Sequence, residues 1–158
     1  MKHAQFIVEL VEKNKIRLTE QNDTIAESYA QKAIKSLRAT DLLIENNLPE
    51  EATTMTYYAM YHKVTALFYT TGIICENHAA SIILLKELFS IDNKKISFAQ
   101  EERVAKQYYT DSKVTTKEVK ELRETANEFI AEINDFIDKL TNDQKNKIKE
   151  NFKQKYCQ

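Results

Sequence analysis

The chain has 158 residues, with 23 Lys and Arg, 24 Asp and Glu, and a formal net charge of -1. This length predicts one domain with a core of its own. Because the chain holds a single Gly and a single Pro, its composition argues against sheet-rich folds and excludes the glycine-rich loops that cradle phosphates. The near-neutral balance gives no overall attraction to nucleic acid or to a membrane, so any such affinity must come from a local patch.

The two cysteines, Cys75 and Cys157, are too few for a disulfide framework. Charged residues interrupt the apolar start MKHAQFIVELVEKNK, which is therefore not typical of a signal peptide. We expect a reducing, cytoplasmic location. Cys75 and His78 have the spacing of half a zinc site, but only His62 and Cys157 could supply the other half, so we expect no metal and no cofactor.

Every long segment predicts a helix. Apolar residues recur at helical spacing over residues 4–15. Asp23 is the expected N-cap of a second helix, which ends at Asn46 and Asn47. Pro49 suits the first turn of a third helix.

The third helix, which Gly72 is expected to end, differs from the others in composition. From residue 52 to residue 75 its only charged side chain is Lys63. A helix that is apolar nearly all round is buried on most sides, and its Thr, Tyr and His content argues against a membrane span. We interpret it as the central helix of a bundle or as a dimer interface.

Four further helix starts follow. Asn77 is the expected cap of a helix over residues 78–89. Three pairs have the spacing of a capping box: Ser97 with Gln100, Thr115 with Glu118, and Thr141 with Gln144. The helix after Ser97 is expected to end near Tyr109, and the last helix to cover residues 142–156. The prediction is one all-α domain over residues 1–158, an antiparallel up-and-down bundle of about five to seven helices.

The last predicted helix, in the tail over residues 141–158, carries five Lys against two acidic residues. Such a basic C-terminal helix is typical of a solvated face, and binding to nucleic acid is the alternative.

Two groups of polar residues could carry chemistry. His62 lies mid-helix in YYAMYHK, with Tyr58 one turn earlier on the same face. A core histidine bonded to a neighbour explains this pattern, and proton transfer or phosphate contact is the functional alternative. Glu76, Asn77 and His78 meet at a predicted helix start, where capping by Asn77 is a sufficient explanation and anion binding is the alternative.

Arg103 is one of only four arginines and stands five residues before Tyr108. A surface ion pair beside an aromatic ring would contribute little. The functional alternative is an arginine that binds phosphate next to a ring on which a base stacks.

The run AQKAIKSLRATDLLIENNLPEEATTMTYYAMYHKVTALFYTTGIICENHAASIILLKELF resembles HEPN domains (higher eukaryotes and prokaryotes nucleotide-binding). A helix of small and apolar residues precedes the aromatic-rich YYAMYHKVTALFYTTG, and a short loop and a His that opens the next helix follow it. The later run ERVAKQYYTDSKVTTKEVKELRETANEFIAEI looks like stand-alone prokaryotic members, with an Arg shortly before a Tyr and then Ala126 and Phe129. The resemblance covers roughly residues 24–140.

The resemblance implies a helical bundle that is usually a homodimer. Many members are ribonucleases, often toxins paired with a nucleotidyltransferase antitoxin or parts of defence systems. Their typical motif places an Arg four to six residues before a His, and no Arg stands there before His62 or His78. Some members without the motif are binding proteins or partners of other proteins. His78 corresponds to the family's His after the loop.

The first hypothesis is therefore a HEPN-like protein that binds nucleotide, RNA or a partner protein of the nucleotidyltransferase type, as a component of a toxin–antitoxin or defence system. The alternative is a metal-independent endoribonuclease, in which His78 is the base and Arg103 stabilises charge in a dimer cleft. The candidate binding residues are Glu76, Asn77, Tyr58, His62 and Tyr108. A third hypothesis is a helical adaptor with neither a basic cleft nor a pocket.

Overall fold

The computed structural model describes residues 2–108 and 113–157 of the chain. Over these residues the elements are α1 (Lys2–Glu12), β1 (Ile16–Leu18), α2 (Asp23–Glu45), α3 (Pro49–Thr71), β2 (Ile73–Cys75), α4 (His78–Phe89), α5 (Lys94–Tyr108), α6 (Thr116–Lys139) and α7 (Asn142–Tyr156). The predicted all-α fold is confirmed, because the only sheet among these elements pairs two strands of three residues.

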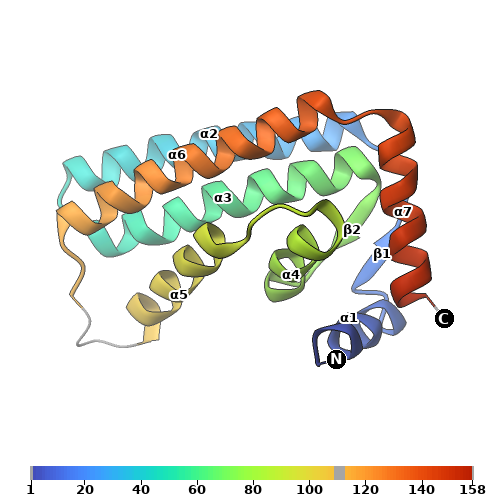
Figure 1. The fold of residues 1–158 in the computed structure, drawn as a ribbon. Helices are drawn as coiled ribbons and strands as arrows, with labels where there is room; N and C mark the ends of the chain where they lie inside the picture. The colour runs from blue at the N-terminus through green and yellow to red at the C-terminus, as the bar shows by residue number, and fades with distance from the viewer. Residues whose placement is uncertain (1, 109–112, 158) are drawn as a thin grey trace.

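The long helices form a bundle. Figure 1 shows α2, α3 and α6 lying lengthwise, with α5 below them, and α2, α3, α5 and α6 alternate in direction along the chain. This is the predicted up-and-down arrangement. α7 stands across one end of the bundle, where α1 packs against it and both chain termini lie.

α3 is the central helix, as its composition predicts. It contacts α2, α4, α5, α6, α7 and β2, and Tyr57, Met60 and Leu67 are fully buried. Its many threonines are compatible with burial because their hydroxyls donate to the carbonyl one turn earlier, as Thr56 and Thr70 do. A buried hydroxyl therefore leaves no unmet hydrogen bond.

Two predicted helix starts are wrong. The side chain of Asn22, and not that of Asp23, accepts the backbone N–H that caps α2, so Asp23 lies in the first turn. α5 begins at Lys94, where Asp92 accepts the backbone N–H, and Ser97 lies inside the helix. In both places a neighbouring residue that caps equally well starts the helix earlier.

The capping boxes at Thr115 and Thr141 are confirmed. The N-terminal helix ends at Glu12, earlier than residue 15, since β1 follows it closely. The expected end of the fifth helix at Tyr109 lies outside the described residues, and α5 is described as far as Tyr108.

The small sheet joins distant parts of the chain. β1 and β2 pair antiparallel, with Ile16 opposite Cys75 and Leu18 opposite Ile73. Gly72 precedes β2 in a left-handed conformation, with a φ of 75°, and its carbonyl accepts the backbone N–H of Thr19. The sheet thereby fixes the segment that leads from the end of α3 to the start of α4.

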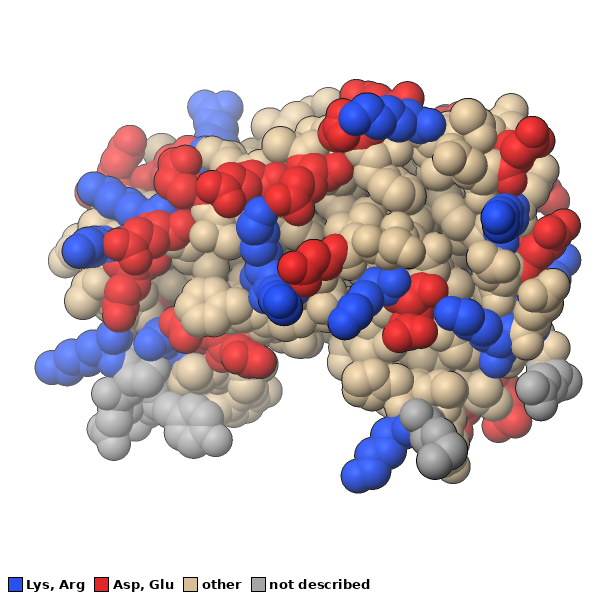
Figure 2. Space-filling model, viewed as in Figure 1, with Lys and Arg blue, Asp and Glu red and all other residues tan. Residues whose placement is uncertain are grey.

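Charges of both signs are mixed on the face seen in Figure 2, with acidic side chains gathered on its left half, where α6 begins. Three lysines of the basic helix α7 have partners: Lys145 donates to Gln21, Lys149 to the carbonyl of Thr19, and Lys155 pairs with Glu87. These contacts hold α7 to the bundle. Among the described residues, no helix is both long and apolar enough to cross a membrane.

Candidate functional site

Aromatic and histidine rings gather around a cavity of about 350 Å³ at the junction of α2, α3 and the start of α4. We call it the tyrosine–histidine cavity. The rings that line it are those of Tyr29, Tyr58, Tyr61, His62, Phe68, Tyr69 and His78. Lys32, Arg17 and Glu76 line it as well, so apolar faces and charged groups meet in one place.

The spacing along α3 explains most of this wall. Tyr58, Tyr61, His62, Thr65 and Tyr69 recur every three or four residues, which places them on one face of a helix. β2 then turns the chain back, and His78 opens α4 against the same face.

His78 is held by two contacts. Its Nδ1 lies 2.8 Å from the hydroxyl of Tyr57, and its ring stacks on Tyr61 with 3.8 Å between ring centroids and an interplanar angle of 11°. Burial and the nearby guanidinium of Arg103 lower the pKa of His78. The imidazole is therefore neutral near pH 7, which suits a proton acceptor.

Asn77 is the cap of α4, as predicted. Its side-chain oxygen accepts the backbone N–H of Ala80 at 2.9 Å. Because Asn77 fills this structural role, the ring of His78 is left to line the cavity. Asn77 itself does not line it.

Replacing Asn77 with alanine is expected to lower the free energy of unfolding by about 1 kcal/mol, since the first turn of α4 loses its side-chain acceptor. Urea unfolding measures this change. Asn77→Asp keeps an acceptor and should stay close to wild type. Equal losses in both variants would contradict the capping role.

His62 has a buried ring nitrogen, Nδ1, that lacks a hydrogen-bond partner among the described residues. Its ring stacks on Tyr58, with centroids 6.0 Å apart. The core histidine bonded to a neighbour that the sequence favoured finds no such bond at this nitrogen in the part of the chain that the structure describes. Burial, followed by the charge of Lys32 and by His78, lowers the pKa of His62. The His62 ring lines the cavity, and its Nδ1 is a buried polar atom whose hydrogen-bonding capacity is unmet within the described residues.

Arg103 lies behind Tyr58. Its Nη2 donates to the Tyr58 hydroxyl at 3.3 Å, and its Cζ lies 5.1 Å from the Tyr58 ring centroid and 5.3 Å from that of Tyr57. Its buried Nε has no partner within the described residues. Among the described residues Arg103 forms no ion pair, and of the ion pair beside an aromatic ring that the sequence allowed, the aromatic contact is found.

Tyr58 separates two spaces. It lines the tyrosine–histidine cavity on one side and, on the other, a cavity of about 310 Å³ that Arg103 and Lys106 also line. Arg103 is thus near the histidines but does not line their cavity. A movement of the Tyr58 ring would be needed to bring the guanidinium to a ligand beside His78.

Of the two remaining predicted site residues, Glu76 lies at the tyrosine–histidine cavity and Tyr108 does not. Glu76 is exposed at the cavity and pairs with Arg17 at 2.8 Å and with Lys15 at 3.3 Å, contacts that lower its pKa. Tyr108 is 70% exposed at the described end of α5 and does not line the tyrosine–histidine cavity. The structure therefore places Tyr108 outside the site.

Sequence reasoning missed several wall residues. Tyr29 stacks on Tyr69 and lies near His62, and the Nζ of Lys32 lies 4.5 Å from the Tyr29 ring centroid. These two residues come from α2, and no spacing pattern links them to α3. Tyr61 could have been found, because it shares the helical face of Tyr58.

Cys75 does not act as a free thiolate. Its Sγ donates to the carbonyl of Asn77 at 3.4 Å, and burial raises the pKa of its thiol. Cys157 is exposed after the end of α7. Within residues 2–108 and 113–157, no three His, Cys, Asp or Glu side chains are grouped so that they could hold a metal ion.

Acidification is expected to destabilise the fold. The pKa of both His62 and His78 is lowered in the folded chain from an ordinary value of 6.5, so below that pH the unfolded chain binds more protons than the folded one. The free energy of unfolding should fall as the pH drops from 7 through the lowered values. A His62→Gln, His78→Gln double variant should lose this part of the dependence in urea unfolding at several pH values. An unchanged dependence would contradict the burial of the two rings.

A family model described as HEPN domain matches residues 26–140, well over half of the chain. The matched segment runs from α2 to the C-terminal end of α6 and includes both histidines of the cavity. No functionally curated protein matches the chain significantly.

Proposed function

The chain belongs to the HEPN domain family, which supports RNA cleavage or nucleotide and RNA binding in general, and we propose that its tyrosine–histidine cavity binds one nucleotide unit. The unit is a free nucleotide or a residue of single-stranded RNA. In both, a flat base is joined to an anionic phosphate, and the cavity offers a surface for each.

The observation that carries this proposal is that tyrosine rings, two imidazoles and the ammonium of Lys32 line one cavity. Its volume, about 350 Å³, lies at the lower end of the range of ligand pockets. Tyrosine faces provide stacking for a base without selecting a sequence. The ring centroids of Tyr29 and Tyr58 lie 5.9 and 6.0 Å from that of His62.

The phosphate would face the imidazoles of His62 and His78 and the ammonium of Lys32, which all line the cavity. An anion favours the protonated imidazole, so its binding raises the lowered pKa values of the two rings. Affinity for a phosphate-bearing ligand should therefore increase as the pH falls from 8 to 6. Adenosine, which has no phosphate, should show no such dependence.

Calorimetric titration with adenosine monophosphate, adenosine and a six-nucleotide single-stranded RNA tests the proposal. The monophosphate should bind more tightly than adenosine, and tighter binding of the RNA would identify the polymer as the ligand. Lys32→Ala should lower the affinity for both anionic ligands. Lys35→Ala, a matched change on the exposed side of α2, should leave both affinities unchanged. Absence of binding by all three ligands would overturn the proposal.

A second candidate function is metal-independent RNA cleavage, which the placement of His62 and His78 on one cavity favours. One neutral imidazole would take the proton of a 2′-hydroxyl, and the resulting oxygen would attack phosphorus. The bond to the 5′-oxygen breaks, and the other histidine, protonated, gives its proton to this leaving oxygen. The products are a 2′,3′-cyclic phosphate and a 5′-hydroxyl end.

Cleavage of end-labelled RNA in the presence of EDTA tests this chemistry. Cleavage that His78→Ala abolishes would support it. Its absence in the wild-type protein would leave binding as the function.

We also propose a homodimer with a nucleotidyltransferase-type partner protein, in a toxin–antitoxin or defence role in the cytoplasm. The family resemblance supports this assembly, and a dimer could bring His78 and Arg103 of two copies to one cleft. Light scattering of the purified chain should give twice its mass of 18.4 kDa. A monomer at all concentrations would contradict the shared cleft.

A further inference from the structure

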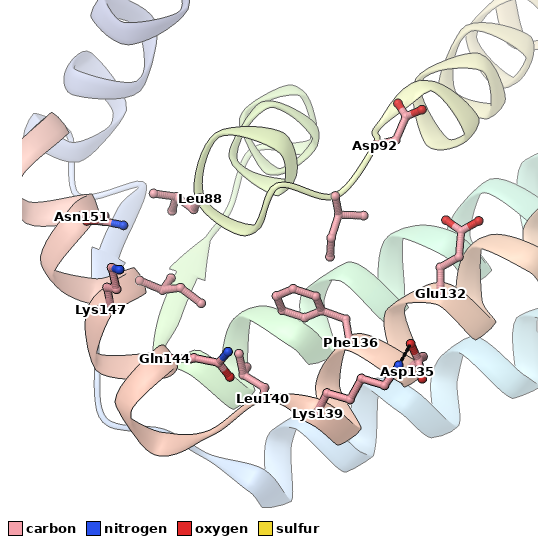
Figure 3. Close-up of a pocket in the computed structure, with 12 residues that line it drawn as sticks. Leu88, Asp92, Glu132, Asp135, Phe136, Lys139, Leu140, Gln144, Lys147 and Asn151 are labelled. Carbon is pink, nitrogen blue, oxygen red and sulfur yellow. Dashed lines mark hydrogen bonds and ion pairs between the residues drawn. The ribbon is translucent and has the colours of Figure 1, made fainter.

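A second and larger cavity lies away from the tyrosine–histidine cavity. It measures about 570 Å³ and is enclosed by the end of α4, the α4–α5 connection, the second half of α6 and the first half of α7 (Figure 3). The two cavities share no lining residue. We call it the α6–α7 cavity.

The floor of the α6–α7 cavity is apolar. It is formed by Leu88, Ile91, Phe136, Leu140 and Ile148. Figure 3 shows the Phe136 ring pointing from α6 into the space between α4 and α7, and this ring is fixed edge-on against Phe89, with centroids 6.0 Å apart. An exposed apolar hollow of this size is typical of a binding site.

The acidic groups on its rim already have partners. Asp135 pairs with Lys139 at 2.7 Å, a contact drawn in Figure 3. Glu132 pairs with Lys95, and Asp92 accepts the backbone N–H that begins α5. Glu132 and Asp135 are therefore paired with lysines, whereas Asp92 keeps its charge and acts as the cap of α5.

Lys147 differs from these acidic groups in its surroundings. It lines the cavity, and it forms no ion pair or side-chain hydrogen bond with any residue in the described ranges 2–108 and 113–157. Asn151 lies one turn further along α7 on the same rim, so one acid group could reach both side chains (Figure 3). Lys147 is thus an unpaired positive charge on the α7 side of the cavity, and Figure 3 shows Asp92 on the far side, beside the start of α5.

We propose that the α6–α7 cavity binds a small amphipathic acid, whose apolar body covers the floor and whose acid group pairs with Lys147 and Asn151. The Lys147 ammonium attracts the acid group of the ligand. Burial of the ligand's apolar body against the floor stabilises the complex. The site is independent of nucleotide binding, because it lies on other residues.

Calorimetric titration of the full chain with octanoate and with octylammonium, both below their micelle concentrations, tests this proposal. The two probes share one apolar body and differ in the sign of the head group. Octanoate should bind about tenfold more tightly than octylammonium. Equal affinities, tighter binding of the cation, or no binding of octanoate would overturn the proposal.

Variants then locate the site. Lys147→Glu should weaken octanoate binding about tenfold, whereas Lys153→Glu, which makes the same charge change on α7 outside the cavity, should not alter it. Asn151→Trp should block the cavity and abolish octanoate binding while leaving adenosine monophosphate binding intact. An unchanged affinity for octanoate in Lys147→Glu or in Asn151→Trp would overturn the assignment.

Discussion

His78→Ala is expected to weaken the binding of adenosine monophosphate about tenfold, equivalent to about 1.4 kcal/mol. The variant removes one of the two imidazoles that face the proposed phosphate position. It also removes the ring that stacks on Tyr61 at 3.8 Å. Calorimetric titration of the variant beside the wild-type chain measures the loss.

The matched control is His3→Ala, because His3 is exposed on α1 and lines none of the cavities described above. Tyr57→Phe separates positioning from binding, since it removes only the hydroxyl that lies 2.8 Å from Nδ1 of His78. That variant should lower the affinity for adenosine monophosphate by a smaller factor than His78→Ala does, and it should change the pH dependence of the binding. Equal affinity in wild type and His78→Ala would show that the ligand does not contact this ring.

Gly72→Ala is expected to lower the free energy of unfolding by about 2–4 kcal/mol. Gly72 has a φ of 75°, a left-handed conformation that strains residues with a side chain. An added Cβ would also collide with the carbonyl oxygen of Thr19 and would lie 2.6 Å from Cε of Lys149. The variant therefore loosens the contacts that fix β1, the end of α3 and α7 together, and urea unfolding measures the loss.

Ser90→Gly is the matched control for backbone conformation. Ser90 also has a positive φ, 57°, at the end of α4, so glycine there should leave the stability unchanged or raise it by about 0.5–1 kcal/mol. An unfolding curve for Gly72→Ala that matches the wild-type curve would show that the close approach of Gly72 to Thr19 is not required for stability.

The sequence predicts the fold well where local signals are strong. Asn77, Thr115 and Thr141 cap helices through contacts three residues away, so their roles are readable from spacing alone. The paired strands were not predicted, because three residues are too few for a periodic pattern and the partners are more than 50 residues apart. Gly72 was assigned correctly as a helix end, but its contact with Thr19 depends on that pairing.

In the candidate site, too, residues that share a helix were predicted, and residues that depend on the packing of distant segments were not. Tyr58 and His62 share a helical face and were found together, and His78 follows from the start of the next helix. Tyr29 reaches the cavity only because α2 packs antiparallel to α3, which no local pattern specifies. Arg103 and Tyr108 lie on one helix, yet only Arg103 faces the bundle. Spacing along a helix therefore identified residues that share a face, but not which faces meet.

The most direct test of the nucleotide-binding account is to follow the imidazole resonances of His3, His62 and His78 by NMR while adenosine monophosphate is added. The account predicts that the resonances of His62 and His78 shift together and that the pKa of each ring rises toward or above its ordinary value, while His3 stays unchanged. Saturating ligand that leaves both cavity histidines unshifted would contradict the account.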